Sequence, residues 1–136
     1  MPGTPWSNRT DAALTVGITV AIVVLTLTTA YIHLTLGGPL FTLNALGYLA
    51  LAVGIAVTAF PHWFLQRLAW LPRVGLAGYA AVTIVAYLVI GPYFTLGWVA
   101  KAVEVAIIVL VGVDLVRRYG SPRGLMDSAA RTLATR

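Results

Sequence analysis

The stretch Trp98–Arg118, WVAKAVEVAIIVLVGVDLVRR, decides the fold because it combines a membrane-spanning length with internal charge. As a helix rising about 1.5 Å per residue, it would cross the ~30 Å hydrocarbon core of a bilayer. Lys101 and Glu104 lie inside it, one turn apart on one face. A charged side chain at the bilayer centre costs roughly 2.5–3.5 kcal/mol unless it is paired or shielded. Other helices must therefore cover the face that carries Lys101 and Glu104.

The composition indicates a single membrane domain. Of the 136 residues, 60% are hydrophobic and only 10% are charged, whereas soluble domains carry about 25% charged residues. The absence of cysteine excludes disulfides, thiolate chemistry and cysteine-ligated metals within this sequence. The net charge of +5 is better explained by membrane topology than by nucleic-acid binding, and no nucleic-acid motif is present.

Four apolar runs predict an all-α polytopic membrane protein, with four transmembrane helices packed in a bundle. The predicted divisions are a cytoplasmic lead at 1–11, a transmembrane domain at 12–118 and a basic cytoplasmic tail at 119–136. The spans are expected at about 12–36, 40–60, 74–90 and 94–118, with an interfacial segment at 61–73. That segment, PHWFLQRLAWLPR, mixes aromatic and basic side chains, as is typical of a segment at the headgroup level.

The distribution of arginine predicts how the chain is threaded. All eight arginines fall in the lead, the 61–73 segment, the end of the last span or the tail, and none falls in the turns at 37–39 and 91–95. Basic residues collect on the cytoplasmic side of membrane helices. We therefore expect both termini to be cytoplasmic and the two turns to face outward.

The two outward turns carry similar sequences. GPLFTL at Gly38–Leu43 and GPYFTL at Gly91–Leu96 match at five of six positions. A duplication would give two repeated helical hairpins, related by an axis along the membrane normal. The alternative is that Gly-Pro turns with interfacial aromatic residues recur in membrane proteins without duplication.

Five polar side chains are predicted to lie in the outer half of the bundle: His33, Asn44, Tyr48, Lys101 and Glu104. One interpretation is a small outward-opening cavity for a polar ligand, an ion or a proton path, since intramembrane ionisable groups mark functional sites. The alternative is structural, with a Lys101–Glu104 ion pair and with His33 and Asn44 hydrogen-bonded across helices. Contact with a partner subunit is the third interpretation.

Basic residues near the inner surface form a second set of candidates. His62, Arg67 and Arg73 could contact lipid phosphate there, with a role as topology anchors as the alternative. Asp114 is expected to pair with Arg117 or Arg118 at the cytoplasmic border.

No metal or cofactor is predicted. His33 and His62 fall at opposite ends of their spans, so they cannot share a haem. One histidine with one carboxylate is too few ligands for a typical metal site. The sequence also has no nucleophile–base–acid arrangement and no phosphate loop, so we do not expect an enzyme.

The segments GGPLFTLNALGYLALAVG at Gly37–Gly54 and GWVAKAVEVAIIVLV at Gly97–Val111 resemble small, uncharacterised bacterial four-helix integral membrane proteins. The resemblance implies a bacterial inner (plasma) membrane setting and no particular activity. The function expected first is a small integral subunit or accessory protein, which packs among membrane lipids on a larger membrane complex or on copies of itself. The alternative is a small transporter or ligand-binding membrane protein that uses the outer cavity.

Overall fold

The computed structural model describes residues 5–134, which form helices joined by short connections. Within these residues the elements are α1 (Pro5–Leu36), α2 (Pro39–Thr58), α3 (Trp63–Arg67), α4 (Trp70–Ile90), α5 (Thr95–Tyr119) and α6 (Pro122–Ala134). No strand occurs in this part of the chain, so the prediction of an all-α protein is confirmed.

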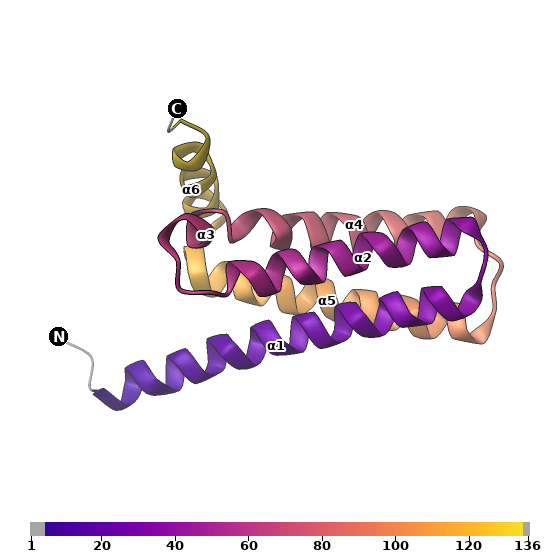
Figure 1. Cartoon of the computed structure of the whole chain (residues 1–136), viewed down its shortest axis with the longest axis horizontal. Coiled ribbons are helices and arrows are strands. Elements are labelled where there is room, and N and C mark those ends of the chain that lie inside the picture. The colour runs from indigo at the N-terminus through magenta and orange to yellow at the C-terminus, as the bar shows by residue number, and fades with distance from the viewer. Residues whose placement is uncertain (1–4, 135–136) are drawn as a thin grey trace.

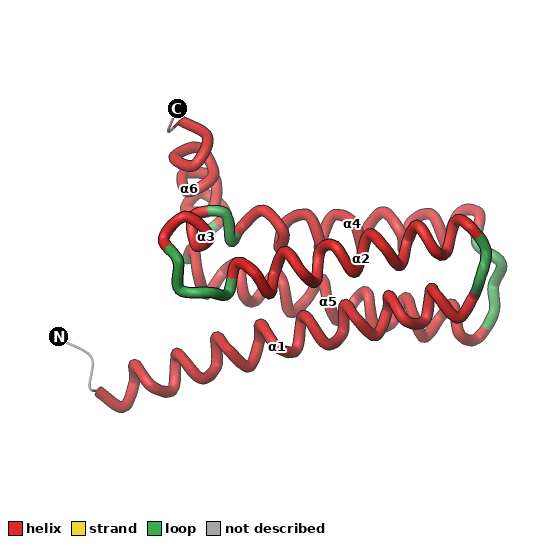
Figure 2. The backbone as a smooth tube through the Cα atoms, viewed as in Figure 1, coloured by secondary structure: helices red, strands yellow, loops and turns green. Residues whose placement is uncertain are grey.

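The four long helices run side by side with neighbouring helices antiparallel (Figure 1). α1 packs against α2 and α5, while α4 packs against α5 and, less extensively, against α2. The connections at 37–38 and 91–94 lie together at one end of the bundle, here named the turn end (Figure 2). The start of α1, α3 and α6 lie at the opposite end, here named the terminal end, where α6 leaves the bundle at a steep angle.

Three helices in the described part of the chain are long and apolar enough to cross a membrane: Asn8–Leu36 within α1, Pro39–Thr58 and Trp70–Ile90. Their length and composition indicate a membrane location. The fourth long helix, α5, is not among the three, and it carries Lys101, Glu104 and Asp114.

The helix boundaries differ from the predicted spans at the terminal end. α4 begins at Trp70, so the predicted interfacial segment 61–73 contributes its last four residues to this helix. Pro72 fits inside the first turn of α4 because the N–H groups there have no partner within the helix. The predicted lead and tail are also largely helical, since α1 begins at Pro5 and α6 reaches Ala134.

The two similar turns differ in local structure. In the first, both glycines have positive φ angles of 70° and 89°, and α2 begins directly after them. In the second, residues 91–94 are non-helical before α5 begins. The Tyr87 hydroxyl holds this longer connection by donating to the Phe94 carbonyl (3.3 Å) and accepting from its N–H (3.2 Å). The hairpin repeat stays a prediction.

The buried side chains of the bundle are arranged in layers along its axis. The middle layer is apolar and fully buried, and it consists of Ile22, Ile55, Leu76, Ile107 and Val111. On α5, Glu104 lies one turn from this layer on one side and Asp114 one turn from it on the other. The apolar layer therefore separates two buried polar clusters, one nearer the turn end and one nearer the terminal end.

Candidate functional site

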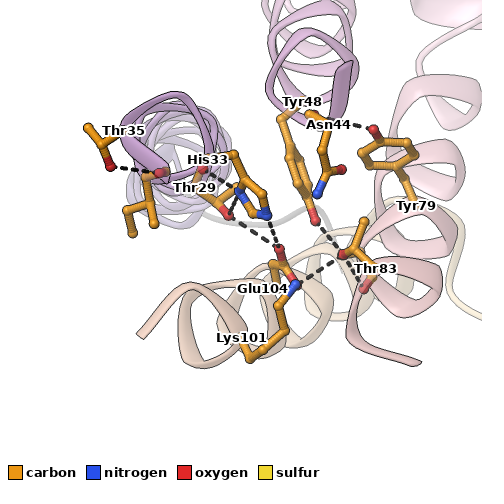
Figure 3. Close-up of polar contacts among 11 residues, drawn as sticks. Thr29, His33, Thr35, Asn44, Tyr48, Tyr79, Thr83, Lys101 and Glu104 are labelled. Carbon is orange, nitrogen blue, oxygen red and sulfur yellow. Dashed lines mark hydrogen bonds and ion pairs between the residues drawn. The ribbon is translucent and has the colours of Figure 1, made fainter. Parts of the chain in front are cut away.

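Glu104 is the centre of the polar cluster nearer the turn end (Figure 3). Its Oε2 accepts hydrogen bonds from the Lys101 ammonium (2.5 Å) and the Thr83 hydroxyl (3.0 Å). Its Oε1 accepts from the Thr29 hydroxyl (3.4 Å) and lies 3.7 Å from His33 Nε2. One carboxylate thus joins α1, α4 and α5. The turn-end cluster is defined here as Thr29, His33, Tyr48, Thr83, Lys101 and Glu104.

Tyr48 connects the remaining helix to this cluster. It is fully buried on α2, and its hydroxyl lies 2.8 Å from Thr83 Oγ1. With Tyr48 as the donor, the Thr83 proton is shared between Glu104 Oε2 (3.0 Å) and the Ala80 carbonyl (2.9 Å), so polar contacts run from α2 through α4 to α5.

The Lys101–Glu104 ion pair is almost completely buried within the protein. The exposed fraction is 7% for Lys101 and 0% for Glu104. The ammonium also lies 5.6 Å from the centre of the Tyr87 ring, within the range of a cation–π contact. The prediction that other helices cover this face of α5 is therefore confirmed, and the covering helices belong to the same chain.

His33 is held in one orientation by its own helix. Its Nδ1 lies 2.7 Å from the Thr29 carbonyl oxygen. Since a carbonyl only accepts, Nδ1 carries the proton of this bond. Nε2 makes no hydrogen bond within the described residues, and it lies 3.7 Å from Glu104 Oε1.

A cavity of about 340 Å³ lies at the turn end among the four long helices, and it is named here the turn-end cavity. Its polar lining residues are His33, Asn44, Tyr79, Thr83, Tyr87 and Lys101. Aliphatic and aromatic side chains, with glycine and proline, form the rest of the wall. A cavity was one of the three interpretations of the polar set, and the lining of this one differs from that interpretation in two residues.

Tyr48 and Glu104 do not line the turn-end cavity. Both are fully buried, and Glu104 is shielded by Lys101 and Thr83, which do line it. Both residues lie on helix faces that point toward the other helices, but side chains from neighbouring helices separate them from the cavity. His33, Asn44 and Lys101 line the cavity as expected.

The Asn44 side-chain amide is a lining group without a hydrogen bond inside the described structure. The Tyr79 hydroxyl donates a hydrogen bond to the backbone carbonyl of Asn44 at 3.2 Å, and not to its side chain. The structural alternative included a bond from the Asn44 side chain across helices, and residues 5–134 contain no such bond. An amide offers two donors and an acceptor, and sheltered polar groups normally find partners. This amide is available to a bound molecule.

The cluster nearer the terminal end is built on Asp114. Its Oδ2 accepts from Arg73 Nε (2.6 Å) and from Arg118 Nε (2.9 Å). Arg73 also donates to the Thr58 hydroxyl (3.3 Å) and the Ala69 carbonyl (2.7 Å). Arg118 also donates to the Thr19 hydroxyl at 3.2 Å. The terminal-end cluster is defined here as Thr19, Thr58, Arg73, Asp114 and Arg118.

Two predictions about arginine residues are corrected or refined by this cluster. Arg73 was expected to contact lipid at the inner surface, which is wrong because its side chain is 0% exposed. The reason is the earlier start of α4, which carries Arg73 into the bundle. Of the two expected partners of Asp114, Arg118 is confirmed, while Arg117 lies 3.8 Å from Asp11 instead.

The other two predicted inner-surface residues are exposed. His62 stacks on Trp63 with ring centres 6.1 Å apart, and the Arg67 guanidinium lies 5.1 Å from the centre of the Trp63 ring. Contact of His62 and Arg67 with lipid headgroups stays a prediction.

Sequence reasoning missed Thr29 and Thr83, which both donate to Glu104. A signal existed for each. Thr29 precedes His33 by one turn on the same face of α1. Thr83 lies between Tyr79 and Tyr87 at four-residue spacing, so the three form a polar stripe on α4.

Comparisons with known protein families, with curated proteins and with solved structures found no match to this chain. Within residues 5–134, no three His, Cys, Asp or Glu side chains group in a way that could hold a metal ion. What the site can bind is therefore inferred from its own groups: a charge-balanced ion pair, a histidine nitrogen, an unbonded amide and aromatic rings.

Proposed function

We propose that the protein is a small inner-membrane protein with four transmembrane helices, α1, α2, α4 and α5. The 25 residues of α5 are long enough to cross the hydrocarbon core. Its Lys101, Glu104 and Asp114 side chains are enclosed by the other helices, so the helix presents mainly apolar side chains outward. The arginine-rich segments all belong to the terminal end, which supports a cytoplasmic position for both termini.

Cysteine labelling tests this topology, and the natural absence of cysteine makes the background clean. Leu40→Cys at the turn end and Met126→Cys in α6 both replace exposed side chains. We expect a membrane-impermeant maleimide to label the Leu40→Cys variant in intact spheroplasts, and the Met126→Cys variant only after the membrane is opened. The reverse pattern, or labelling of both variants in intact spheroplasts, would contradict the proposed threading.

We further propose that the protein binds a small, mostly apolar and uncharged molecule in the turn-end cavity. The observation that carries this proposal is the Asn44 amide, which lines the cavity without a hydrogen bond in the described structure. The cavity volume of about 340 Å³ is within the range of small-molecule sites, which are mostly apolar with a few polar groups. Lys101 and Glu104 balance each other's charge, which favours an uncharged ligand.

The apolar layer supports binding rather than passage through a single chain. Ile22, Ile55, Leu76, Ile107 and Val111 are fully buried between the two polar clusters. Close packing of these side chains leaves no polar route along the bundle axis.

The role of accessory subunit or homo-oligomer stays a prediction. The feature that would have required a partner was the charged face of α5, and that face is already covered by α1, α2 and α4. Ligand binding is therefore the better supported of the two functions.

Filling the cavity tests the binding proposal. Ala86 lines the cavity, whereas Ala81, on the same helix, is exposed and does not line it. We expect native mass spectrometry of the wild type, extracted from its own membrane in mild detergent, to show a reproducible small-molecule mass. Ala86→Phe should reduce its occupancy at least about tenfold because the ring takes the ligand's space, while Ala81→Phe should retain it. Equal retention in both variants, or no bound mass in the wild type, would contradict the proposal.

A further inference from the structure

A second hollow region lies near the terminal end, along α1 and α2 and away from the turn-end cavity. Its polar part, of about 500 Å³, includes Thr15, Thr19, Thr58, Gln66, Arg118 and Tyr119 in its lining. Its apolar part, of about 410 Å³, includes Val20, Val23, Val24, Ala56 and Phe60. Thr19, Val20 and Ala59 line both parts, so the two adjoin. The two parts together are named here the α1–α2 groove.

The groove borders a cluster with an excess of positive charge. Asp114 is the one carboxylate of the terminal-end cluster, and it is shared by the guanidinium groups of Arg73 and Arg118. Arg73 Nη2 is buried and donates to no group in the described residues. Arg118 lines the polar part of the groove, and its side chain is 28% exposed. A phosphate group would supply the missing negative charge, and guanidinium groups bind phosphate through strong charge-assisted hydrogen bonds.

Along α1 the two parts of the groove lie in the order that a membrane amphiphile requires. On α1 the lining runs from Thr15 in the polar part to Val24 in the apolar part, about 13 Å nearer the middle of the bundle by helix rise. On the α2 side the apolar lining runs from Ala56 to Phe60 and Pro61, which follow the end of the helix at Thr58. A molecule with its charged group at Arg118 would therefore extend its apolar chain toward the membrane centre.

We propose that the α1–α2 groove binds an anionic phospholipid, with its phosphate at Arg118 and one acyl chain along the apolar part. The proposal rests on the membrane placement above and is independent of the ligand in the turn-end cavity. The charge of the terminal end favours an anionic headgroup over a zwitterionic one, since within residues 5–134 this end carries seven arginines and three aspartates. The apolar part of the groove favours a lipid over free phosphate.

Native mass spectrometry of the delipidated full chain in mild detergent tests the proposal. Phosphatidylglycerol and phosphatidylcholine with the same acyl chains are added separately at equal concentration. We expect the protein to retain one phosphatidylglycerol at least about tenfold more than phosphatidylcholine. Both lipids offer a phosphate to Arg118, but the choline ammonium is repelled by the excess positive charge of the terminal end. Equal retention of the two lipids would overturn the proposal.

Two arginine variants distinguish the groove from general attraction to the basic end. Arg118→Gln should lower phosphatidylglycerol retention about tenfold. Arg123→Gln removes the same charge from α6, from a residue that lines neither part of the groove, and should change retention less than about twofold. Equal losses in the two variants would mean that no specific site exists.

A third variant leaves the ionic cluster intact. Ala59 is an exposed residue at the junction of the two parts, so Ala59→Trp should block the groove and lower retention about tenfold even where Arg118→Gln fails to fold. Normal retention in Ala59→Trp would overturn the proposal. Displacement of phosphatidylglycerol by millimolar inorganic phosphate would also do so, because it would identify a site for free phosphate.

Discussion

Glu104→Gln is expected to lower the free energy of unfolding by about 3–5 kcal/mol, the range found when one partner of a buried ion pair is removed. The substitution leaves the Lys101 ammonium without a counter-charge in a site where it is 7% exposed. It also replaces one carboxylate oxygen by a donor group, either Oε2, which accepts from Lys101 and Thr83, or Oε1, which accepts from Thr29.

The double variant Lys101→Met with Glu104→Gln should be more stable than either single variant. It removes both charges, so no unpaired charge remains inside the bundle. Reversible unfolding of the four proteins in mixed micelles gives the coupling energy of the pair. A double variant whose loss equals the sum of the two single losses would show that the ion pair contributes no coupling, and the turn-end cluster would need another explanation.

Thr29→Val and Thr28→Val provide a matched control for the hydrogen bonds around Glu104. Thr29 donates to Glu104, whereas Thr28 is exposed and bonds the Val24 carbonyl of its own helix. The loss in Thr29→Val should be about 1 kcal/mol greater than in Thr28→Val. This comparison keeps the two charges in place, so it separates the hydrogen-bond network from the ion pair.

The features that could be predicted from the sequence are those that depend on one helix at a time. Long apolar runs located the helices because a membrane-spanning helix needs about 20 apolar residues. The Lys101–Glu104 pair followed from a three-residue spacing, which places two side chains on the same face of any helix. The same reasoning placed His33 and Asn44 near one end of the bundle, where both now line the turn-end cavity.

The features that could not be predicted depend on how neighbouring helices are rotated. Asn44 and Tyr48 lie one turn apart on α2, yet one lines the cavity and the other is fully buried beneath it. Sequence spacing gives the face of a helix and the depth of a residue, but it does not say which side chain of the next helix covers that face. The contact between Arg73 and Asp114 has the same origin, since it joins α4 to α5 across 41 positions of sequence.

The position of Arg73 also depended on a helix boundary. Trp70, Pro72 and Arg73 have the composition of an interfacial segment, and a proline often marks the edge of a helix. Here α4 begins before the proline, which occupies the first turn. A shift of four residues was enough to move one arginine from the expected surface into the bundle.

The terminal-end cluster leads to the second large effect, because its charges are unequal. Asp114→Asn should lower the free energy of unfolding by about 3–5 kcal/mol, since it leaves Arg73 and Arg118 facing each other without a carboxylate. Arg73 cannot recover solvation by moving outward, because its side chain is 0% exposed and is held by Thr58 and Ala69.

Arg73→Met should cost less than Asp114→Asn, although Arg73 is the more deeply placed of the two arginines. Methionine is an unbranched apolar side chain that can adapt to the space, and Asp114 keeps its bond to Arg118. We expect a loss of about 1–2 kcal/mol for Arg73→Met. The same mixed-micelle unfolding experiment compares the two variants directly.

Combining the two substitutions completes the test, because Arg73→Met should restore part of the stability lost in Asp114→Asn. In the double variant only Arg118 lacks a counter-charge, and its partly exposed side chain can turn toward the surface. A larger loss for Arg73→Met than for Asp114→Asn would mean that the bonds of Arg73 to Thr58 and Ala69 outweigh its ion pair. The cluster would then be held by hydrogen bonds to α2 and to the residue that precedes α4, and charge imbalance would not explain its stability.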